Sequence, residues 1–184
     1  MTTPEWTQSW TLYPGPSRLP DAAAPDVRAR SHSISAEVLL PTASDGGVIV
    51  AHGDRTSGYS VRVADGHLVH HYVHGGGLCS TVSSSRIPVG RPVRLEVLVR
   101  REGPGGTVTL LVEDLAVGTG RIQSLARGRT GYTGVDVGCD RGLPVGTYDA
   151  PARFTGRLAS VLIQAADDQH LDPVIAWQVA DSAG

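Results

Sequence analysis

The stretch HLVHHYVH, residues 67–74, holds four of the seven histidines of the chain, and imidazole suits both metal binding and acid–base chemistry. On an extended strand His67 and His71 point to the same face but stand about 13 Å apart, and His70 and His74 are equally separated. A zinc ion needs its nitrogen ligands within about 2.1 Å, so no pair of these rings chelates an ion without outside ligands. No HExxH or CxxC motif accompanies them. We therefore expect neither a metal site nor a cofactor.

The dipeptide Asp65-Gly66, just before this run, predicts a two-residue β-hairpin, because both central positions of such a turn favour positive φ. Folding the chain there sets Val61 opposite His70, on a face with Tyr72 that looks into the core. Successive side chains of a strand alternate between faces, so His71 points the other way. We expect His70 to be buried and His71 to be solvated.

His70 occupies a core-facing position where an apolar or aromatic residue is the default. A buried imidazole needs a hydrogen-bond partner, and burial usually lowers its pKa and leaves it neutral at pH 7. Two interpretations stay open. His70 is either a hydrogen-bonded core histidine or, together with Tyr72, a residue that lines a pocket between or beside the sheets.

The elements around this hairpin are short strands. Apolar residues alternate with polar ones in SHSISAEVLL, VRLEVLVR and TVTLLVED, and glycine or proline marks each break, as in EGPGG. Many short strands at this spacing predict an all-β fold, a two-sheet antiparallel β-sandwich of the jelly-roll type. We expect one domain over residues 1–165 and a C-terminal extension over 166–184, with room for one added strand around 174–179.

Composition excludes several classes of protein. A net charge of −2, scattered arginines and no lysine argue against nucleic acid and anionic membranes as partners. No apolar run is long enough to span a bilayer, and the N-terminus lacks the features of a signal peptide, so we expect a cytoplasmic protein. Its two cysteines, Cys79 and Cys139, are then expected to be free thiols.

Several segments, read in order, resemble a known domain. These are residues 10–20, 30–38, 47–60, 65–72 and 137–156, and together they are similar to the C-terminal jelly-roll domain of bacterial arylsulfatases. The resemblance covers about residues 8 to 165 and implies a sandwich like that of laminin G or concanavalin A. Its most specific part is the last segment, with matches at Gly138, Asp140, Gly142, Pro144, Val145, Tyr148, Pro151, Phe154, Thr155 and Gly156.

The resemblance does not extend to sulfatase chemistry. Sulfatases oxidise a Cys or Ser in a CxPSR motif, and PGPSR at residues 14–18 has Pro14 at that position, which offers no oxidisable side chain. The chain also departs from the domain at His70, Val73 and Cys139, where that domain typically has an aromatic residue, Asn and Arg. We predict that the protein is not a sulfatase.

Three functions remain open. The first is a non-catalytic module that binds a small molecule or a carbohydrate and derives from a sulfatase accessory domain. The second is a small acid–base enzyme, an isomerase, cyclase or lyase of a specialised bacterial pathway, and the third is a structural or interaction protein, with a homo-oligomer possible. The ligand-binding candidates are Tyr59, Tyr72, Arg55, Asp140, Arg141 and Tyr148, and the catalytic candidates, should the protein be an enzyme, are His70 and His52.

Sandwiches of this class often hold a calcium ion in a rim loop. The loop GCDRGLPVG supplies Asp140 alone, with Arg141 beside it, whereas calcium takes six to eight oxygen ligands. We expect Asp140 to have a structural role instead, either paired with an arginine or accepting amides of its own loop.

Overall fold

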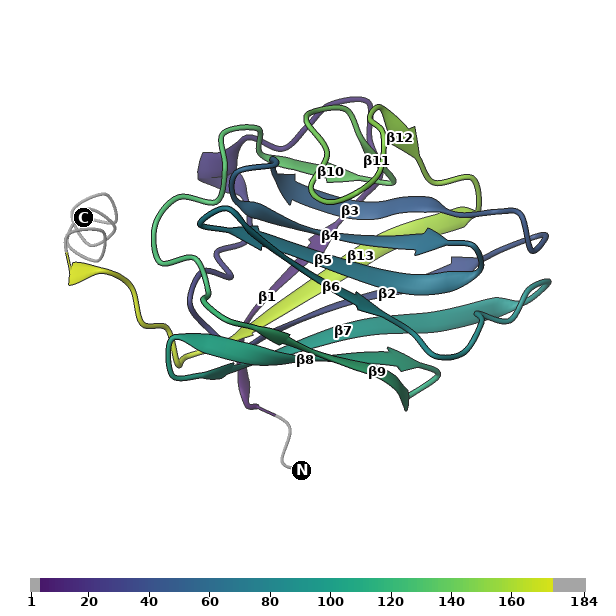
Figure 1. The fold of residues 1–184 in the computed structure, drawn as a ribbon. Coiled ribbons are helices and arrows are strands. Elements are labelled where there is room, and N and C mark those ends of the chain that lie inside the picture. Colours follow the sequence, from purple (N-terminus) through teal and green to yellow (C-terminus); the bar gives the residue numbers. More distant parts are fainter. Residues whose placement is uncertain (1–3, 174–184) are drawn as a thin grey trace.

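Two antiparallel sheets are stacked face to face in the computed structural model, which describes residues 4–173 (Figure 1). One sheet has the order β1 (Trp6–Leu12), β13 (Arg157–Ala166), β2 (His32–Leu39), β7 (Pro92–Glu102), β8 (Gly105–Val112), β9 (Leu115–Ile122). The other has the order β10 (Val135–Val137), β3 (Gly47–Gly53), β4 (Gly58–Ala64), β5 (His67–His74), β6 (Gly77–Val82). A small ribbon joins β11 (Cys139–Asp140) to β12 (Ala152–Arg153), and one 3₁₀ turn, η1, spans Asp21–Ala23. The predicted all-β sandwich is confirmed.

The core lies between the two sheets and follows the period-two pattern of the sequence. On β7 every second residue from Val93 to Val99 is buried, and β8 buries Val108, Leu110 and Val112 against the opposite sheet. No helix within residues 4–173 has the length and apolarity to cross a bilayer. The strand predicted around 174–179 falls outside the described residues.

The predicted hairpin joins β4 to β5 in the expected register. Asp65 and Gly66 have φ values of 51° and 77°, and Val61 lies opposite His70. His70 faces the core as expected, whereas the expectation that His71 is solvated is wrong: its exposed fraction is 1 %. The reason is that another part of the chain covers the outer face of β4 and β5.

That cover is the loop over residues 141–150, which follows β11. Gly146 is in contact with the His71 ring, since a methyl group there would lie 1.8 Å from Nδ1, and Tyr148 stacks on the same ring with centroids 6.3 Å apart. From β4, the Ser60 hydroxyl donates to the Val145 carbonyl at 2.7 Å. The loop therefore turns an outer sheet face into a second, polar layer of contacts.

Asp140 holds this loop in shape. Its carboxylate accepts the Gly142 amide at 2.9 Å and the Tyr148 hydroxyl at 2.6 Å, and the Tyr148 oxygen in turn accepts the Val145 amide at 3.2 Å. Burial and the hydrogen bond to Asp140 both raise the pKa of Tyr148. The expected acceptance of loop amides by Asp140 is confirmed.

On the side of the sandwich where the chain runs through β6 and β9, the edges of the two sheets approach closely. The Cys79 thiol on β6 donates to the Arg121 carbonyl on β9, and the Ser84 amide donates to the Val117 carbonyl at 2.6 Å. A Cβ atom at Gly120 would lie 2.0 Å from the Thr81 hydroxyl oxygen. A Cβ atom at Gly118 would likewise lie 2.9 Å from the Val82 carbonyl oxygen, so the two sheet edges meet here because β9 has glycine at both positions.

We predict that Gly120→Ala lowers the free energy of unfolding by about 1–3 kcal/mol, because the added methyl group overpacks the contact with Thr81. Urea denaturation measures the change. The matched control is Gly128→Ala, since a methyl group at residue 128 meets nothing within 4 Å. Equal stability of the two variants would show that the sheet edges separate in solution.

Candidate functional site

The predicted site residues do not converge on one place. His70 and Tyr59 lie in the core, and Tyr72 reaches from the core to a cavity beside β6 and β9. Asp140, Arg141 and Tyr148 belong to the loop network and its anchor. His52 and Arg55 come to one end of the sandwich, at the end of β3 and in the loop after it. Each of these places therefore offers different chemistry.

Within the core, His32, Tyr59 and His70 form a buried polar cluster. The rings of His32 and Tyr59 have centroids 6.3 Å apart, and the Nδ1 nitrogen of His32 donates to the Arg30 carbonyl at 3.0 Å. Among the described residues, His32 Nε2, the Tyr59 hydroxyl and both ring nitrogens of His70 have no partner. His70 is thus a core residue but not the hydrogen-bonded one that a buried imidazole normally is.

Burial dominates the titration of this cluster. It lowers the pKa of His70 to about 3, with smaller contributions from His32 and His71, and it lowers the pKa of His32 to about 4. Both rings are consequently neutral at pH 7. His70 has an exposed fraction of 0 % and lines neither of the cavities described below, so the proposed role of its ring in catalysis is not favoured by the geometry.

Arg141 serves as an anchor rather than as part of an open site. Its guanidinium contacts the buried carboxylate of Asp136 at 2.5 Å, and its backbone amide donates to the same carboxylate at 2.8 Å. Arg18 contacts Asp136 from the other side at 2.7 Å. The PSR sequence that imitates a sulfatase motif thus contributes Arg18 to an internal ion pair.

A cleft of about 290 Å³, here called the rim cleft, opens at the end of the sandwich where His52 lies. Backbone hydrogen bonds in both directions join Leu19 to Val135 on β10, and Val135 lies opposite His52 on β3. The chain that leaves Leu19 therefore brings Asp21 to His52. The rim cleft is lined by Asp21, Asp26, Arg28, His52, Arg129 and Thr130, among others.

Each carboxylate of the rim cleft already has a cationic partner. Asp26 accepts two hydrogen bonds from the Arg28 guanidinium, both at 2.8 Å, and a third from Gln169 at 3.1 Å. Burial raises the pKa of Asp26, but these contacts outweigh it and hold the pKa below its usual value. Asp21 lies 3.5 Å from the Arg129 guanidinium. The cleft is therefore polar, with its formal charges balanced.

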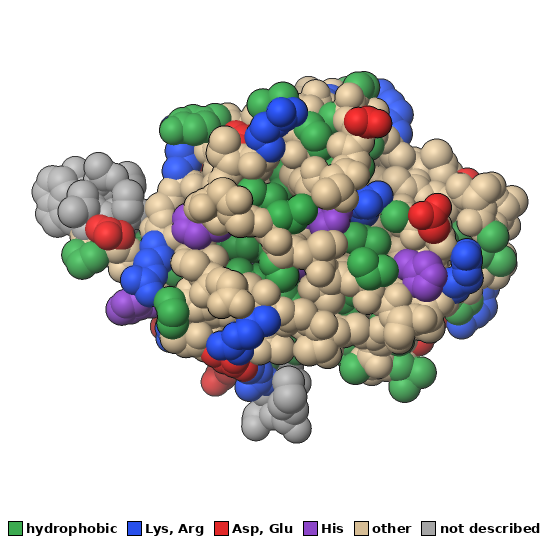
Figure 2. All heavy atoms as spheres, in the orientation of Figure 1, with side chains coloured by type: hydrophobic (Ala, Val, Ile, Leu, Met, Phe, Trp, Pro, Cys, Tyr) green, Lys and Arg blue, Asp and Glu red, His purple; other side chains and the backbone are tan. Residues whose placement is uncertain are grey.

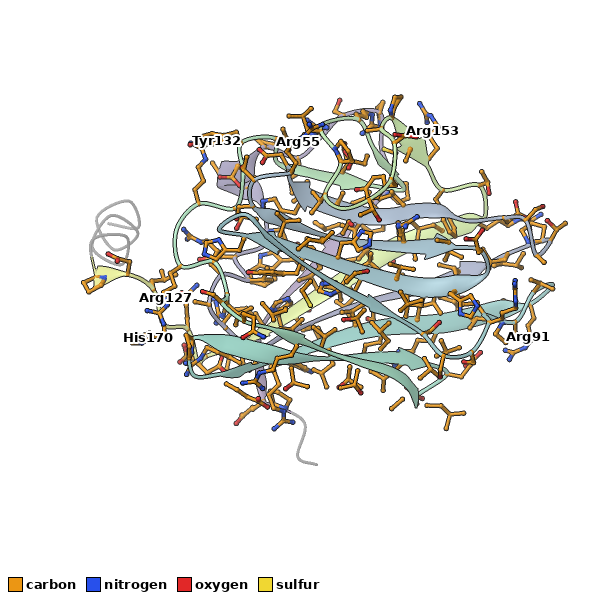
Figure 3. All side chains as sticks on the ribbon, viewed as in Figure 1. Arg55, Arg91, Arg127, Tyr132, Arg153 and His170 are labelled. Carbon is orange, nitrogen blue, oxygen red and sulfur yellow. The ribbon has the colours of Figure 1, made fainter. Side chains whose placement is uncertain are left out.

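An aromatic ring stands beside this cleft. Tyr132 has an exposed fraction of 75 %, and the Arg129 guanidinium lies over it, 4.6 Å from the ring centroid. The Tyr132 amide donates to the carboxylate of Asp54, which places Tyr132 next to Arg55, and Figure 3 shows both side chains at the same end of the sandwich. An exposed aromatic face and a polar cleft thus lie next to each other.

His52 contributes a positioned but shielded imidazole. Its Nε2 nitrogen bonds to Asp21 at 2.9 Å, while Nδ1 is buried without a partner among the described residues and the ring meets Tyr59 edge-on at 5.5 Å. Burial lowers the pKa of His52, and Asp21 partly offsets that effect. A general base must reach the proton that it removes. His52 has one nitrogen bonded to Asp21 and the other facing the core, so the arrangement suits binding better than proton transfer.

Over residues 4–173, no group of three or more His, Cys, Asp or Glu side chains is arranged to hold a metal ion. Sequence reasoning found His52 and Arg55 but missed Asp21, Arg129 and Tyr132. The only signal for these was their loop position between strands, which many residues share. Their convergence arises from the bridge between Leu19 and Val135, which no local pattern reveals.

Comparison with known proteins gives the fold alone. No protein-family model matches the chain, and no curated protein matches it. Solved structures with similar folds include domains LG4-5 of the mouse laminin α1 chain, at 17 % identity and TM-score 0.55, over 87 % of this chain and 42 % of that one. The chain thus spans less than half of that laminin fragment.

Two further structures are similar at comparable levels. The CBM40 of the Ruminococcus gnavus IT-sialidase, bound to α2,3-sialyllactose, has 12 % identity and TM-score 0.55 over 82 % of this chain and 83 % of that one. The SAP-like pentraxin of Limulus polyphemus has 14 % identity and TM-score 0.50 over 84 % and 75 %. The expected laminin-G-like jelly roll is confirmed as a fold.

We predict that His70→Leu raises the free energy of unfolding at pH 7 by about 1–3 kcal/mol, since it removes two buried ring nitrogens that lack partners. Denaturant unfolding measures the change, with the exposed His170→Leu as control (Figure 3). A loss of stability in the His70 variant would show that the ring is hydrogen-bonded in solution.

Stability should also fall with acid. The folded-state pKa values of His32 and His70 lie below the ordinary value of 6.5, so between about pH 6.5 and about pH 3 the unfolded chain binds more protons. Stability is therefore full above pH 6.5 and decreases as the pH falls, by up to about 1.4 kcal/mol per pH unit for each histidine. The melting temperature of His70→Leu should fall less steeply between pH 6.5 and pH 3 than that of the natural protein. Parallel plots of melting temperature against pH would contradict the lowered pKa of His70.

Proposed function

We propose that the protein is a non-catalytic module that binds neutral glycans at the rim cleft. The observation that carries the proposal is a polar cleft with paired charges beside the exposed ring of Tyr132. Sugar hydroxyls donate to carboxylates and accept from guanidinium groups, and the apolar face of a sugar ring packs on an aromatic side chain. The carboxylates and guanidinium groups of the rim cleft offer the two polar contacts, and the adjacent Tyr132 ring, under the Arg129 guanidinium, offers the third.

The charge balance of the cleft favours a neutral ligand. Asp21 and Asp26 are matched by Arg28 and Arg129, so the lining has no surplus charge to attract an anion. The surface seen in Figure 2 likewise shows acidic and basic side chains interspersed, without a large patch of one sign. A volume of about 290 Å³ lies near the lower end of small-ligand sites, which suits the terminal unit of a glycan.

The fold is compatible with this function. The CBM40 structure carries sialyllactose on a sandwich of the same kind, which makes sugar binding reasonable here by analogy of fold. The sequence resemblance to the accessory domain of bacterial arylsulfatases supports a further part of the proposal, namely that the module derives from such a domain. The segment that matches this domain best, residues 137–156, stabilises the sandwich through Asp140 and Tyr148. None of its residues lines the rim cleft.

We expect NMR titration of the full chain with lactose, cellobiose and maltose to show binding of at least one of them with a Kd of about 1 mM or tighter. Tyr132→Ala should raise that Kd about tenfold, because the exposed ring supplies the packing surface. The matched control is Tyr13→Ala, a tyrosine of similar exposure at 70 % that follows β1, whereas the Tyr132 ring contacts Arg129 of the cleft lining.

Two results would contradict the proposal. One is a folded protein that binds none of the three sugars. The other is binding that Tyr132→Ala and Tyr13→Ala weaken equally, because the ligand would then not lie beside Tyr132.

A further inference from the structure

A second cavity, here called the edge pocket, lies beside the contact between the two sheet edges. It is lined by the end of β5 (Tyr72, His74), by the first residues of β6, and by Arg121 to Ser124 at and after the end of β9. Its volume is about 420 Å³, larger than that of the rim cleft, and the two cavities share no lining residue. The edge pocket is therefore a separate cavity from the rim cleft.

The position of this pocket follows from the chain around it. β5 and β6 are joined through Gly75 and Gly76, whose φ values of 60° and 80° permit a tight turn, so His74 and the first residues of β6 lie together. The Cys79 thiol bonds the Arg121 carbonyl at 3.0 Å and fixes β6 against β9 at this point. The pocket walls are thus formed by the edge strands of the two sheets, which this bond holds together.

Polar groups in the pocket have unused hydrogen-bonding capacity. The Tyr72 oxygen accepts the Ala126 amide at 2.8 Å, which leaves its own proton for a ligand atom. Burial raises the pKa of Tyr72 to about 12, so the phenol remains a donor at neutral pH. His74 Nδ1 is buried and has no partner among the described residues. A ligand carboxylate would accept the Tyr72 proton and, when the His74 proton is on Nδ1, that N–H as well.

Charge in the edge pocket has one sign. The described residues that line it include Arg121 and no Asp or Glu. Arg121 donates from one Nη nitrogen to Glu102 at 3.0 Å, outside the lining, and a guanidinium has further N–H groups in its planar fork. Planar carboxylates match that fork in two parallel hydrogen bonds. The pocket thus differs from the balanced rim cleft.

The remaining lining is apolar. Ile122 is buried at the pocket, Leu78 is exposed there, and the Tyr72 ring adds an aromatic surface. Small-molecule sites typically combine such apolar walls with a few polar groups that fix orientation. With one cation, two unused polar groups and this apolar surface, the lining defines a specific class of ligand.

We propose that the edge pocket is a second ligand site, which binds a small carboxylate with a compact apolar body. The carboxylate lies against Arg121 and within reach of the Tyr72 hydroxyl and the His74 ring. The apolar body packs on Leu78 and Ile122. The site is independent of glycan binding at the rim cleft.

The test is an NMR titration of the ¹⁵N-labelled full chain with cyclohexanecarboxylate, compared with the uncharged cyclohexylmethanol. We expect a Kd of about 1 mM or tighter for the carboxylate and at least tenfold weaker binding of the alcohol, roughly the loss of one charge-assisted contact. Shifts should cluster at residues 72–80 and 121–126. Equal affinity for the two probes, or no saturable binding of the carboxylate, would overturn the proposal.

A matched pair of variants isolates the charge. Arg121→Gln removes the cation of the pocket, whereas Arg91→Gln removes an arginine that pairs with Glu113 in a similarly exposed ion pair elsewhere. We expect only Arg121→Gln to weaken carboxylate binding, by about tenfold or more. The same loss in both variants would show that net charge, not the pocket, attracts the probe.

Thiol alkylation gives a readout that does not depend on the titration. Cys79 lines the pocket, whereas Cys139 is buried elsewhere and serves as an internal reference. Saturating cyclohexanecarboxylate should slow the reaction of Cys79 with iodoacetamide at least threefold relative to Cys139, and Tyr132→Ala at the rim should leave this protection intact. Unchanged alkylation of Cys79 at saturation would place the probe outside the edge pocket and refute the assignment.

Discussion

The carboxylate of Asp136 is the interaction on which both the loop cover and the rim cleft depend. It is buried and lies between the guanidinium groups of Arg18 and Arg141. Burial raises the pKa of Asp136, but its hydrogen bonds to the two arginines outweigh that effect and keep the carboxyl ionised. Breaking such a buried pair by removing one partner usually costs several kcal/mol, because the other charge stays buried and unpaired.

The position of Asp136 explains this central role. It lies on β10, a strand of three residues that pairs with β3. Arg18 directly precedes Leu19, which bridges to the same strand and so directs Asp21 toward His52. On its other side, Arg141 begins the loop that covers the outer face of β4 and β5. One carboxylate, paired with two arginines, therefore fixes the N-terminal segment, an edge strand and a long loop together.

Sequence reasoning succeeded where the determinants are local. Alternating apolar residues gave the strands and their inner faces, and Asp65-Gly66 gave the register of β4 against β5, including the inward position of His70. It failed for His71, because the cover that buries this ring comes from residues 141–150, far along the chain. A period of two says which face a side chain occupies, but not whether another segment lies on that face.

The same limit applies to the candidate sites. Asp21 and Arg129 meet through contacts that span more than a hundred residues, and no spacing rule connects them. Tyr72 was identified because it faces inward from the hairpin, yet its pocket is formed with Arg121 on a strand of the other sheet. Conversely, Asp140 and Tyr148, which match the resembling domain, bond to each other and to amides of their own loop. The residues with the clearest sequence signal thus stabilise the sandwich, while the clefts are lined by residues with a weak one.

The close contact of β6 with β9 also affects how the molecule meets copies of itself. An unpaired strand edge is a template for pairing with another chain. The side-chain-free backbone at Gly120 lets each of these two edges shield the other, and β10 is short and bridged by Leu19. Among the described edge strands of the two large sheets this leaves β1 open to addition. Self-association by sheet extension would therefore proceed through residues 6–12, at the side of the sandwich away from β9.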